Sequence, residues 1–349
     1  MQCFEQLIGT QSGLVLAFIA TAALVVVTGI KLSMYGDALG DRTGLGNGLI
    51  GLIFLAGVTS LPELVVSLTS VFNAATAADG ADLATGNMLG SNVFNLLILA
   101  FMAIFFTKHF KPAAMKSSHT SSIIYGLLML GLFAAAYIRA PRESWIIPGL
   151  DCSALVLALP VFYLGVLFRE HRQLKNAAEE TEEHLPEEDA LAHMPATRFY
   201  SILLGLCALI IGGGVILSIL GSRMALPPEQ GGFGLEASLI GTIFLAISTS
   251  LPELVISFSS IRLGFLDMAV GNVLGSNMFN LLIIFVADLA MRGDSMLAKA
   301  SSKHWTSVAL IFVLTLAGWL LLKTKTRTAS LAVAVSMIVL YAASMALFI

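Results

Sequence analysis

The sequence predicts an all-α integral membrane protein with ten transmembrane helices, arranged as two five-helix repeats of inverted topology. The first observation is composition: of 349 residues, 57% are hydrophobic and 12% are charged, whereas a soluble domain carries about 25% charged residues. The second is a series of apolar runs of about 20 residues, the length that crosses a bilayer. The third is a set of sequence blocks that occur twice in the same order.

The apolar runs fall into two groups of five, separated by one strongly charged segment. The first group lies at about residues 13–33, 46–71, 83–106, 119–138 and 147–168, and the second at about residues 199–220, 235–260, 267–290, 304–322 and 329–348. This pattern divides the chain into a first repeat (1–168), a linker (169–198) and a second repeat (199–349). The linker contains the run EETEEHLPEEDA, which predicts a solvated segment.

The distribution of basic residues predicts the orientation in the membrane. If the N-terminus lies outside, the inner loops hold thirteen of the 19 Lys and Arg residues, including several in the linker. Cytoplasmic loops carry an excess of Lys and Arg, so we expect both termini outside and the linker in the cytoplasm. We expect a multi-pass protein of a prokaryotic inner (plasma) membrane.

Three blocks of the first half recur in the second half. The pairs are GLGNGLIGLIFLA from Gly44 and GLEASLIGTIFLA from Gly234, TSLPELVVSL from Thr59 and TSLPELVISF from Thr249, and GNMLGSNVFNLLI from Gly86 and GNVLGSNMFNLLI from Gly271. They define two shorter repeats at about residues 44–106 and 234–290. Because five is an odd number, the second copy enters the membrane from the opposite side, and such proteins bind their substrates near the midplane between the repeats.

Each TSLPEL block places a glutamate, Glu63 or Glu253, inside an apolar span. A charged residue there costs roughly 3 kcal/mol or more, so it normally faces protein or water and marks an ion or proton path. Helical spacing puts hydroxyl groups on the same face as each glutamate. These residues are Thr59, Ser60 and Ser67 in the first block and Thr249, Ser250 and Ser257 in the second.

Each block also holds a proline beside the glutamate, Pro62 or Pro252. Proline cannot donate to the carbonyl one turn earlier, here that of Val58 or Ser248. We expect a broken helix whose carbonyl groups serve as cation ligands where they line a cavity. The alternative is an ordinary kink of a membrane helix.

The GSN blocks predict a second polar wall. Asparagine and serine recur at every fourth position, which places one stripe on each helix: Asn87, Ser91 and Asn95 in the first half, and Asn272, Ser276 and Asn280 in the second. We expect these stripes to belong to the site, although such residues also form plain interhelical hydrogen bonds. That structural role is our expectation for Asn92 and Asn277, which point off the stripes. We expect Asp82 and Asp267 to be helix N-caps.

Two carboxylates surrounded by hydroxyl, amide and carbonyl oxygens suit a hard cation such as Ca²⁺, which takes six to eight oxygen ligands. Two unpaired carboxylates close together repel strongly in a low dielectric. One divalent ion, two monovalent ions or two protons would each neutralise them. That equivalence is a physical basis for exchange.

Other classes of function find less support in the sequence. No basic run suggests nucleic-acid binding, the three cysteines match no zinc spacing, and no nucleophile and base occur together as an enzyme would need. We expect no enzymatic activity and no cofactor, with inorganic cations and the lipid bilayer as partners and no nucleic acid. A passive cation channel remains an alternative, although a channel more naturally uses an oligomeric ring.

The paired TSLPEL and GSN blocks resemble the two alpha-repeats of the calcium/cation antiporter superfamily, and within it the sodium/calcium exchangers. The resemblance covers the whole chain. It implies a ten-helix antiporter whose first and sixth helices slide across the core to alternate access. We expect the protein to be active as a monomer. The ligands that it implies are the carboxylates of Glu63 and Glu253, the oxygens of Thr59, Ser60, Thr249 and Ser250, the side chains of Ser91, Asn95, Ser276 and Asn280, and the backbones of Ala56 and Ala246.

The sequence departs from the family pattern at two places. Val58 and Ser248 stand where the family usually has glycine, and Asn280 stands where many prokaryotic exchangers carry aspartate. The site therefore holds two formal negative charges rather than three. We expect an antiporter that exchanges Na⁺ for Ca²⁺, with Ca²⁺/H⁺ exchange as the alternative, because the charge count leaves the coupling ion open.

Overall fold

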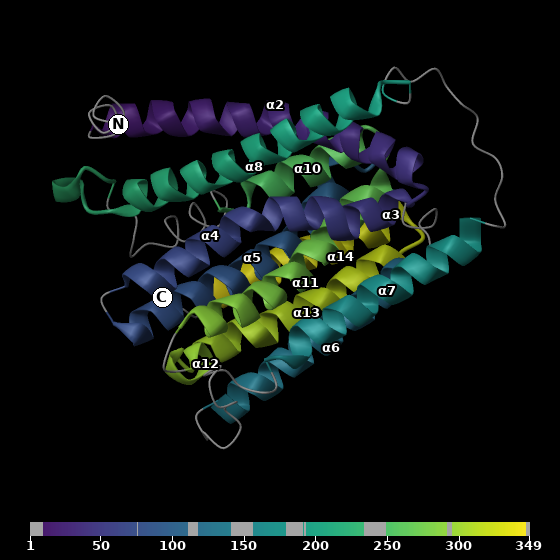
Figure 1. Cartoon of the computed structure of the whole chain (residues 1–349). Helices are drawn as coiled ribbons and strands as arrows, with labels where there is room; N and C mark the ends of the chain where they lie inside the picture. Colours follow the sequence, from purple (N-terminus) through teal and green to yellow (C-terminus); the bar gives the residue numbers. More distant parts are fainter. Residues whose placement is uncertain are drawn as a thin grey trace.

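The computed structural model describes residues 10–74, 76–110, 118–140, 156–178, 191, 193–233, 249–291 and 295–346 (Figure 1). Every regular element in these ranges is a helix, and the same ranges contain no strand. The prediction of an all-α protein is therefore confirmed for this part of the chain.

The described helices divide between the two halves of the chain. Those of the first half are α2 (Gln11–Thr43), α3 (Asn47–Leu49), the π-helix η1 (Ile50–Leu55), α4 (Ala56–Asn73), α5 (Ala77–Phe105), α6 (Ser118–Arg139) and α7 (Ala158–Ala178). Those of the second half are α8 (Ala196–Ala225), the short 3₁₀ helix η4 (Pro228–Gln230), α10 (Leu251–Arg262), α11 (Leu266–Ala290), α12 (Met296–Lys299), α13 (His304–Lys323) and α14 (Arg327–Ala346).

Eight helices in the described ranges are long and apolar enough to cross a membrane. The two other predicted spans, 147–168 and 235–260, lie partly outside those ranges, and their described parts are the apolar stretch Ala158–Arg169 and helix α10. The count of ten helices and the inverted orientation of the halves stay predictions. The predicted linker begins inside α7, which extends to Ala178, and residues 179–190 lie outside the described part.

Helix α2 extends ten residues beyond the C-terminal end of the predicted span. The glycine-rich run GDALGDRTGLGNG at residues 36–48 suggests a tight turn between helices, and this interpretation is wrong for residues 36–43, which are helical. The helix ends at Gly44, which adopts a left-handed conformation with φ of 69° that favours glycine. Arg42 in the last turn donates to the carbonyl oxygens of Leu191 and Met194, at 2.5 Å each. Its guanidinium also lies 4.1 Å from the ring centre of Phe199 at the start of α8.

Helices α5 and α11 form the centre of the molecule and contact each other, α4 and α10. Helices α2 and α8 pack together along one side, as Figure 1 shows, and lie against α4 and α10. A separate apolar cluster fills this interface, with Val25 and Leu32 from α2, Ile210 and Leu217 from α8, and Ile256 from α10. The molecule thus has a central group of helices and a two-helix layer that contacts both glutamate-bearing helices.

The π-helix η1 touches α11 at backbone distance because glycines line the contact. A Cβ at Gly51 would overlap the carbonyl oxygen of Met268, and one at Gly271 would overlap that of Gly48 in α3, directly before η1. π-Helical turns are rare and occur often at functional sites. Here it leads directly into α4, which carries Glu63.

Gly275 on α11 tests this contact. In a Gly275→Ala variant the new Cβ would overlap the carbonyl oxygen of Leu52 and lie 2.7 Å from the Cβ of Ala56. Overpacking of this kind costs about 1–3 kcal/mol, so we expect a clear fall in melting temperature, measured on purified protein in detergent. Gly131→Ala on the exposed face of α6 is the control, with no described atom within 4 Å of the new Cβ. Equal melting of both variants would contradict the close contact.

Candidate cation site

The two repeated glutamates lie buried on neighbouring helices. Glu63 is on α4 with 1% of its surface exposed, and Glu253 is on α10 with 0% exposed. The helices α4 and α10 contact each other. The structure therefore brings together two carboxyl groups that are 190 positions apart in the sequence.

Each glutamate binds a serine that belongs to the other half of the chain. Ser60 on α4 donates to Oε1 of Glu253 at 3.4 Å, and Ser250, the N-cap residue of α10, donates to Oε1 of Glu63, also at 3.4 Å. Both hydrogen bonds are long, so each is weak. The crossed pair nevertheless fixes which oxygen of each carboxyl group faces the opposite helix.

The second carboxyl oxygen of each glutamate has no hydrogen-bond partner in the described residues. Oε2 of Glu63 and Oε2 of Glu253 are both buried. A buried polar atom without a partner is costly, and a buried charge without one is far more costly. These two oxygens are therefore available to bind a cation or a proton.

Hydroxyl groups from the second wall contact those from the first. The hydroxyl oxygens of Thr59 and Ser276 lie 3.3 Å apart, and Thr59 also donates to the carbonyl oxygen of Ala56 at 3.3 Å. The hydroxyl oxygens of Ser250 and Ser91 lie 3.3 Å apart, and Ser250 can accept from Ser91 while it donates to Glu63. The structure thus brings most of the predicted hydroxyl ligands into one group around the glutamates.

Asn95 and Asn280 lie one turn beyond these serines, on α5 and α11. Both are fully buried at 0% exposure, and none of their side-chain amide atoms has a hydrogen-bond partner among the described residues. Amide oxygens are good ligands for Ca²⁺. Two such side chains in line with Ser91 and Ser276 fit the predicted ligand stripes.

The first asparagine of each stripe has a different role. Asn87 donates to the hydroxyl of Ser67 at 3.0 Å and to the backbone carbonyl of Glu63 at 3.3 Å. Asn272 makes the matching bonds, to Ser257 at 3.0 Å and to the carbonyl of Glu253 at 3.4 Å. These amides hold the glutamate-bearing helices in place from the neighbouring helix.

The expected break at Pro62 is wrong, whereas Pro252 does lie at a helix start. Helix α4 runs unbroken through Pro62 from Ala56 to Asn73, and the irregular turn is η1, just before it. Pro252 lies in the first turn of α10, where the missing N–H would have had no helical partner. Thr249 is half-buried beside Ser250, while Ala246 and Ser248 lie outside the described residues.

The sequence patterns did not predict two histidine–aspartate pairs that the structure contains. His119 lies 2.8 Å from Asp267, and His304 lies 3.2 Å from Asp82, so each pair joins the two halves. The N-cap residues of α5 and α11 are Thr76 and Phe265, so the interpretation of both aspartates as N-caps is wrong. The sequence did contain a signal for these pairs. The offset of 185 positions between the two GSN blocks also relates His119 to His304 and Asp82 to Asp267.

Membrane-length helices that meet at two buried acids and a set of neutral oxygens define an integral membrane protein of the ion-transport class. Comparison with known proteins identifies the family. The chain belongs to the sodium/calcium exchanger protein family, whose sequence model matches residues 13–168 and 199–349. It is therefore a multi-pass membrane protein of a family of cation exchangers, within the calcium/cation antiporter superfamily.

Several known proteins resemble this chain over most of its length. Inner membrane protein YrbG of Escherichia coli (strain K12) is 26% identical over 296 residues, 83% of this chain and 84% of that protein. Putative antiporter CaxA of Alkalimonas amylolytica is 27% identical over 271 residues, 76% of this chain and 77% of that protein. The structure of the sodium-calcium exchanger NCX_Mj has the same fold, with a TM-score of 0.67 at 22% identity over 97% of this chain and 99% of that one.

Melting experiments test whether the unpartnered oxygens hold a cation. Ca²⁺ at about 100 times its dissociation constant would stabilise the folded state by about 2.7 kcal/mol, a rise of about 5 °C in melting temperature. We expect a smaller rise with Mg²⁺, which loses its water reluctantly. Asn280→Leu, which removes one amide oxygen, should reduce the Ca²⁺-dependent rise to less than half. An equal rise with Mg²⁺, or an unchanged rise in the variant, would contradict a Ca²⁺ site here.

Proposed function

We propose that this protein is a secondary antiporter that exchanges Na⁺ for Ca²⁺ across the membrane by alternating access at the site around Glu63 and Glu253. The observation that carries the proposal is the crossed hydrogen bonding of these two carboxyl groups. Each uses one oxygen to bind a serine of the opposite half and leaves the other oxygen without a partner in the described residues. A site of this kind needs positive charge from its cargo.

The proposed ligands supply only oxygen atoms. They are the carboxylates of Glu63 and Glu253, the oxygens of Thr59, Ser60, Thr249 and Ser250, the side chains of Ser91, Asn95, Ser276 and Asn280, and the backbones of Ala56 and Ala246. Two negative charges among neutral oxygens match one Ca²⁺ or two Na⁺. No group of three or more His, Cys, Asp or Glu side chains that could hold a metal occurs in the part of the chain that the structure describes.

Exchange also requires that the site open to one side of the membrane at a time. The α2–α8 layer lies across α4 and α10, and its contact with them runs past the prolines next to both glutamates. A Cβ at Gly214 of α8 would lie 2.5 Å from Cγ of Pro62 and 3.2 Å from Cγ of Pro252. We propose that α2 and α8 slide along this surface and expose the site alternately to either side.

Ca²⁺/H⁺ exchange is the second candidate, because the site carries only two acidic side chains. Asn95 and Asn280 are both amides, so two protons on Glu63 and Glu253 would neutralise the site as fully as two Na⁺ would. A passive channel is a weaker candidate, because both glutamates are enclosed at 1% and 0% exposure. Single-channel currents across a planar bilayer would identify a channel.

The remaining features of the proposal follow from the sequence. They are ten spans in two inverted repeats, both termini outside, a cytoplasmic linker, a prokaryotic inner membrane, and activity as a monomer without a cofactor. The name of the relative YrbG places that protein in an inner membrane. A monomer suffices because the site is built from the two halves of one chain.

Flux measurements in proteoliposomes test the exchange. We expect Ca²⁺ uptake to follow an imposed Na⁺ gradient and to vanish in Glu63→Gln and in Glu253→Gln, because each variant removes one of the two charges. Glu229→Gln, at an exposed position on η4, is the matched control. Uptake driven by a pH gradient and not by Na⁺ would identify the Ca²⁺/H⁺ exchanger. Uptake without any gradient would exclude the antiporter.

A methyl group at Gly214 tests the sliding contact. Gly214→Ala would place its Cβ 2.5 Å from Cγ of Pro62 in the described arrangement, so the methyl group narrows the surface along which α8 is proposed to slide. A strain of about 1.4 kcal/mol that is added at the barrier lowers a rate about tenfold. We expect the maximal rate of Na⁺-driven uptake to fall by about that factor. Gly212→Ala is the control on the same helix, with no described atom within 4 Å of its Cβ. An unimpaired rate in Gly214→Ala would contradict sliding at this contact.

A further inference from the structure

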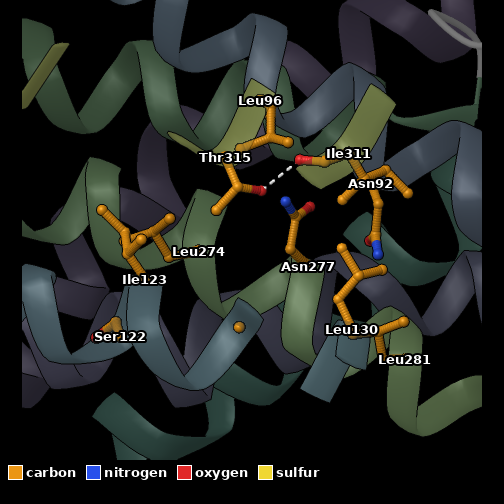
Figure 2. A pocket seen from close by; sticks show the side chains of 11 residues that line it. Asn92, Leu96, Ser122, Ile123, Leu130, Leu274, Asn277, Leu281, Ile311 and Thr315 are labelled. Carbon is orange, nitrogen blue, oxygen red and sulfur yellow. Dashed lines mark hydrogen bonds between the residues drawn. The ribbon is translucent and has the colours of Figure 1, made fainter. Parts of the chain in front are cut away.

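A second polar region lies away from the glutamates, between α5, α6, α11 and α13. It is a cavity of about 20 Å³, and Figure 2 shows the side chains that line it. Apolar residues such as Leu96 and Leu130 form most of the wall. Two asparagines, Asn92 on α5 and Asn277 on α11, stand among them.

Asn92 and Asn277 are equivalent residues of the two GSN blocks, 185 positions apart. Asn92 is 1% exposed, and neither its amide oxygen nor its amide nitrogen has a hydrogen-bond partner among the described residues. The buried amide oxygen of Asn277 lacks a partner in the same ranges. The interhelical hydrogen bond expected from the sequence is therefore not made directly by Asn92.

We propose that this cavity binds a water molecule that is shared by Asn92 and Asn277 and joins the two halves of the protein. A buried water needs a cavity volume of roughly 10–15 Å³ and two to four polar partners. The cavity meets the first condition with about 20 Å³. The two amides meet the second.

Hydroxyl groups in the wall complete the polar surroundings. Thr315 on α13 donates to the carbonyl oxygen of Ile311 at 2.6 Å, and its oxygen can still accept a hydrogen bond (Figure 2). Ser122 on α6 is a further polar lining residue. Because water both donates and accepts, it can satisfy an amide oxygen and an amide nitrogen at once.

The composition of the wall favours water over a cation. The lining residues include asparagine, serine and threonine but no acidic side chain. A cation here would lose its hydration without gaining a countercharge, which is strongly unfavourable. The chemistry therefore differs from that of the site around Glu63 and Glu253.

The shared water would link α5 to α11 on a face of each helix that is separate from its ligand stripe. Ser91 and Asn92 are neighbours on α5, as are Ser276 and Asn277 on α11, and neighbouring positions on a helix point about 100° apart. One face of each helix is then held by the water and the other by contacts with the glutamate-bearing helices. The bridge limits rotation of both helices about their axes.

A double-mutant cycle on the full-length protein tests the bridge. Asn92→Leu or Asn277→Leu alone removes one partner of the water and leaves the other amide unsatisfied, so we expect each to lower the melting temperature by about 3–5 °C. The double variant removes both amides and fills the cavity with apolar groups, so its fall should be clearly smaller than the sum of the two. Additive effects would overturn the shared site.

Two further measurements identify the occupant. A high-resolution structure should show one density peak about 2.7–3.2 Å from both amides. A dry cavity, a lipid chain inside it or a direct bond between the amides would overturn the proposal. The cycle should give the same coupling in NaCl and in choline chloride, and a coupling present only with Na⁺ would overturn water as the ligand. None of these readouts depends on transport, so failure of the antiporter proposal would remain distinguishable.

Discussion

The cost of placing two negative charges in a low dielectric is the constraint on which the rest of this structure depends. Glu63 and Glu253 are enclosed by helices, and repulsion between them cannot be relieved by bulk water. The surrounding polar groups offset this cost only in part, because each serine donates to just one of the two oxygens of a carboxyl group. The remaining oxygens require a positive partner, and this requirement links the architecture to cation exchange.

The two halves depend on each other at every level of the site. Neither glutamate receives its serine hydrogen bond from its own half, and the hydroxyl of Thr59 meets that of Ser276 across the same boundary. The histidine–aspartate pairs also join the two halves, for example His119 with Asp267. A single half would therefore present an incomplete site with its acid unsatisfied. Two copies of the sequence blocks are therefore not enough to form the site, because the two halves must also pack against each other.

Much of the site could be predicted because spacing along a helix determines which residues share a face. That rule placed Thr59 and Ser60 beside Glu63, and Ser91 in line with Asn95. It could not show which hydroxyl meets which acid, because those contacts depend on how α4 packs against α10. The expectation that the missing N–H of proline breaks the helix failed at Pro62, where α4 is continuous, and the irregular segment is η1, which ends before α4 begins.

The contacts of Arg42 couple the position of α2 to that of α8. The guanidinium at the end of α2 binds two carbonyl groups just before α8 and lies over the ring of Phe199 inside α8. A guanidinium stays charged at every physiological pH, so this link does not loosen when the pH changes. Two helices joined in this way move as one unit, so a displacement of either helix also displaces the other.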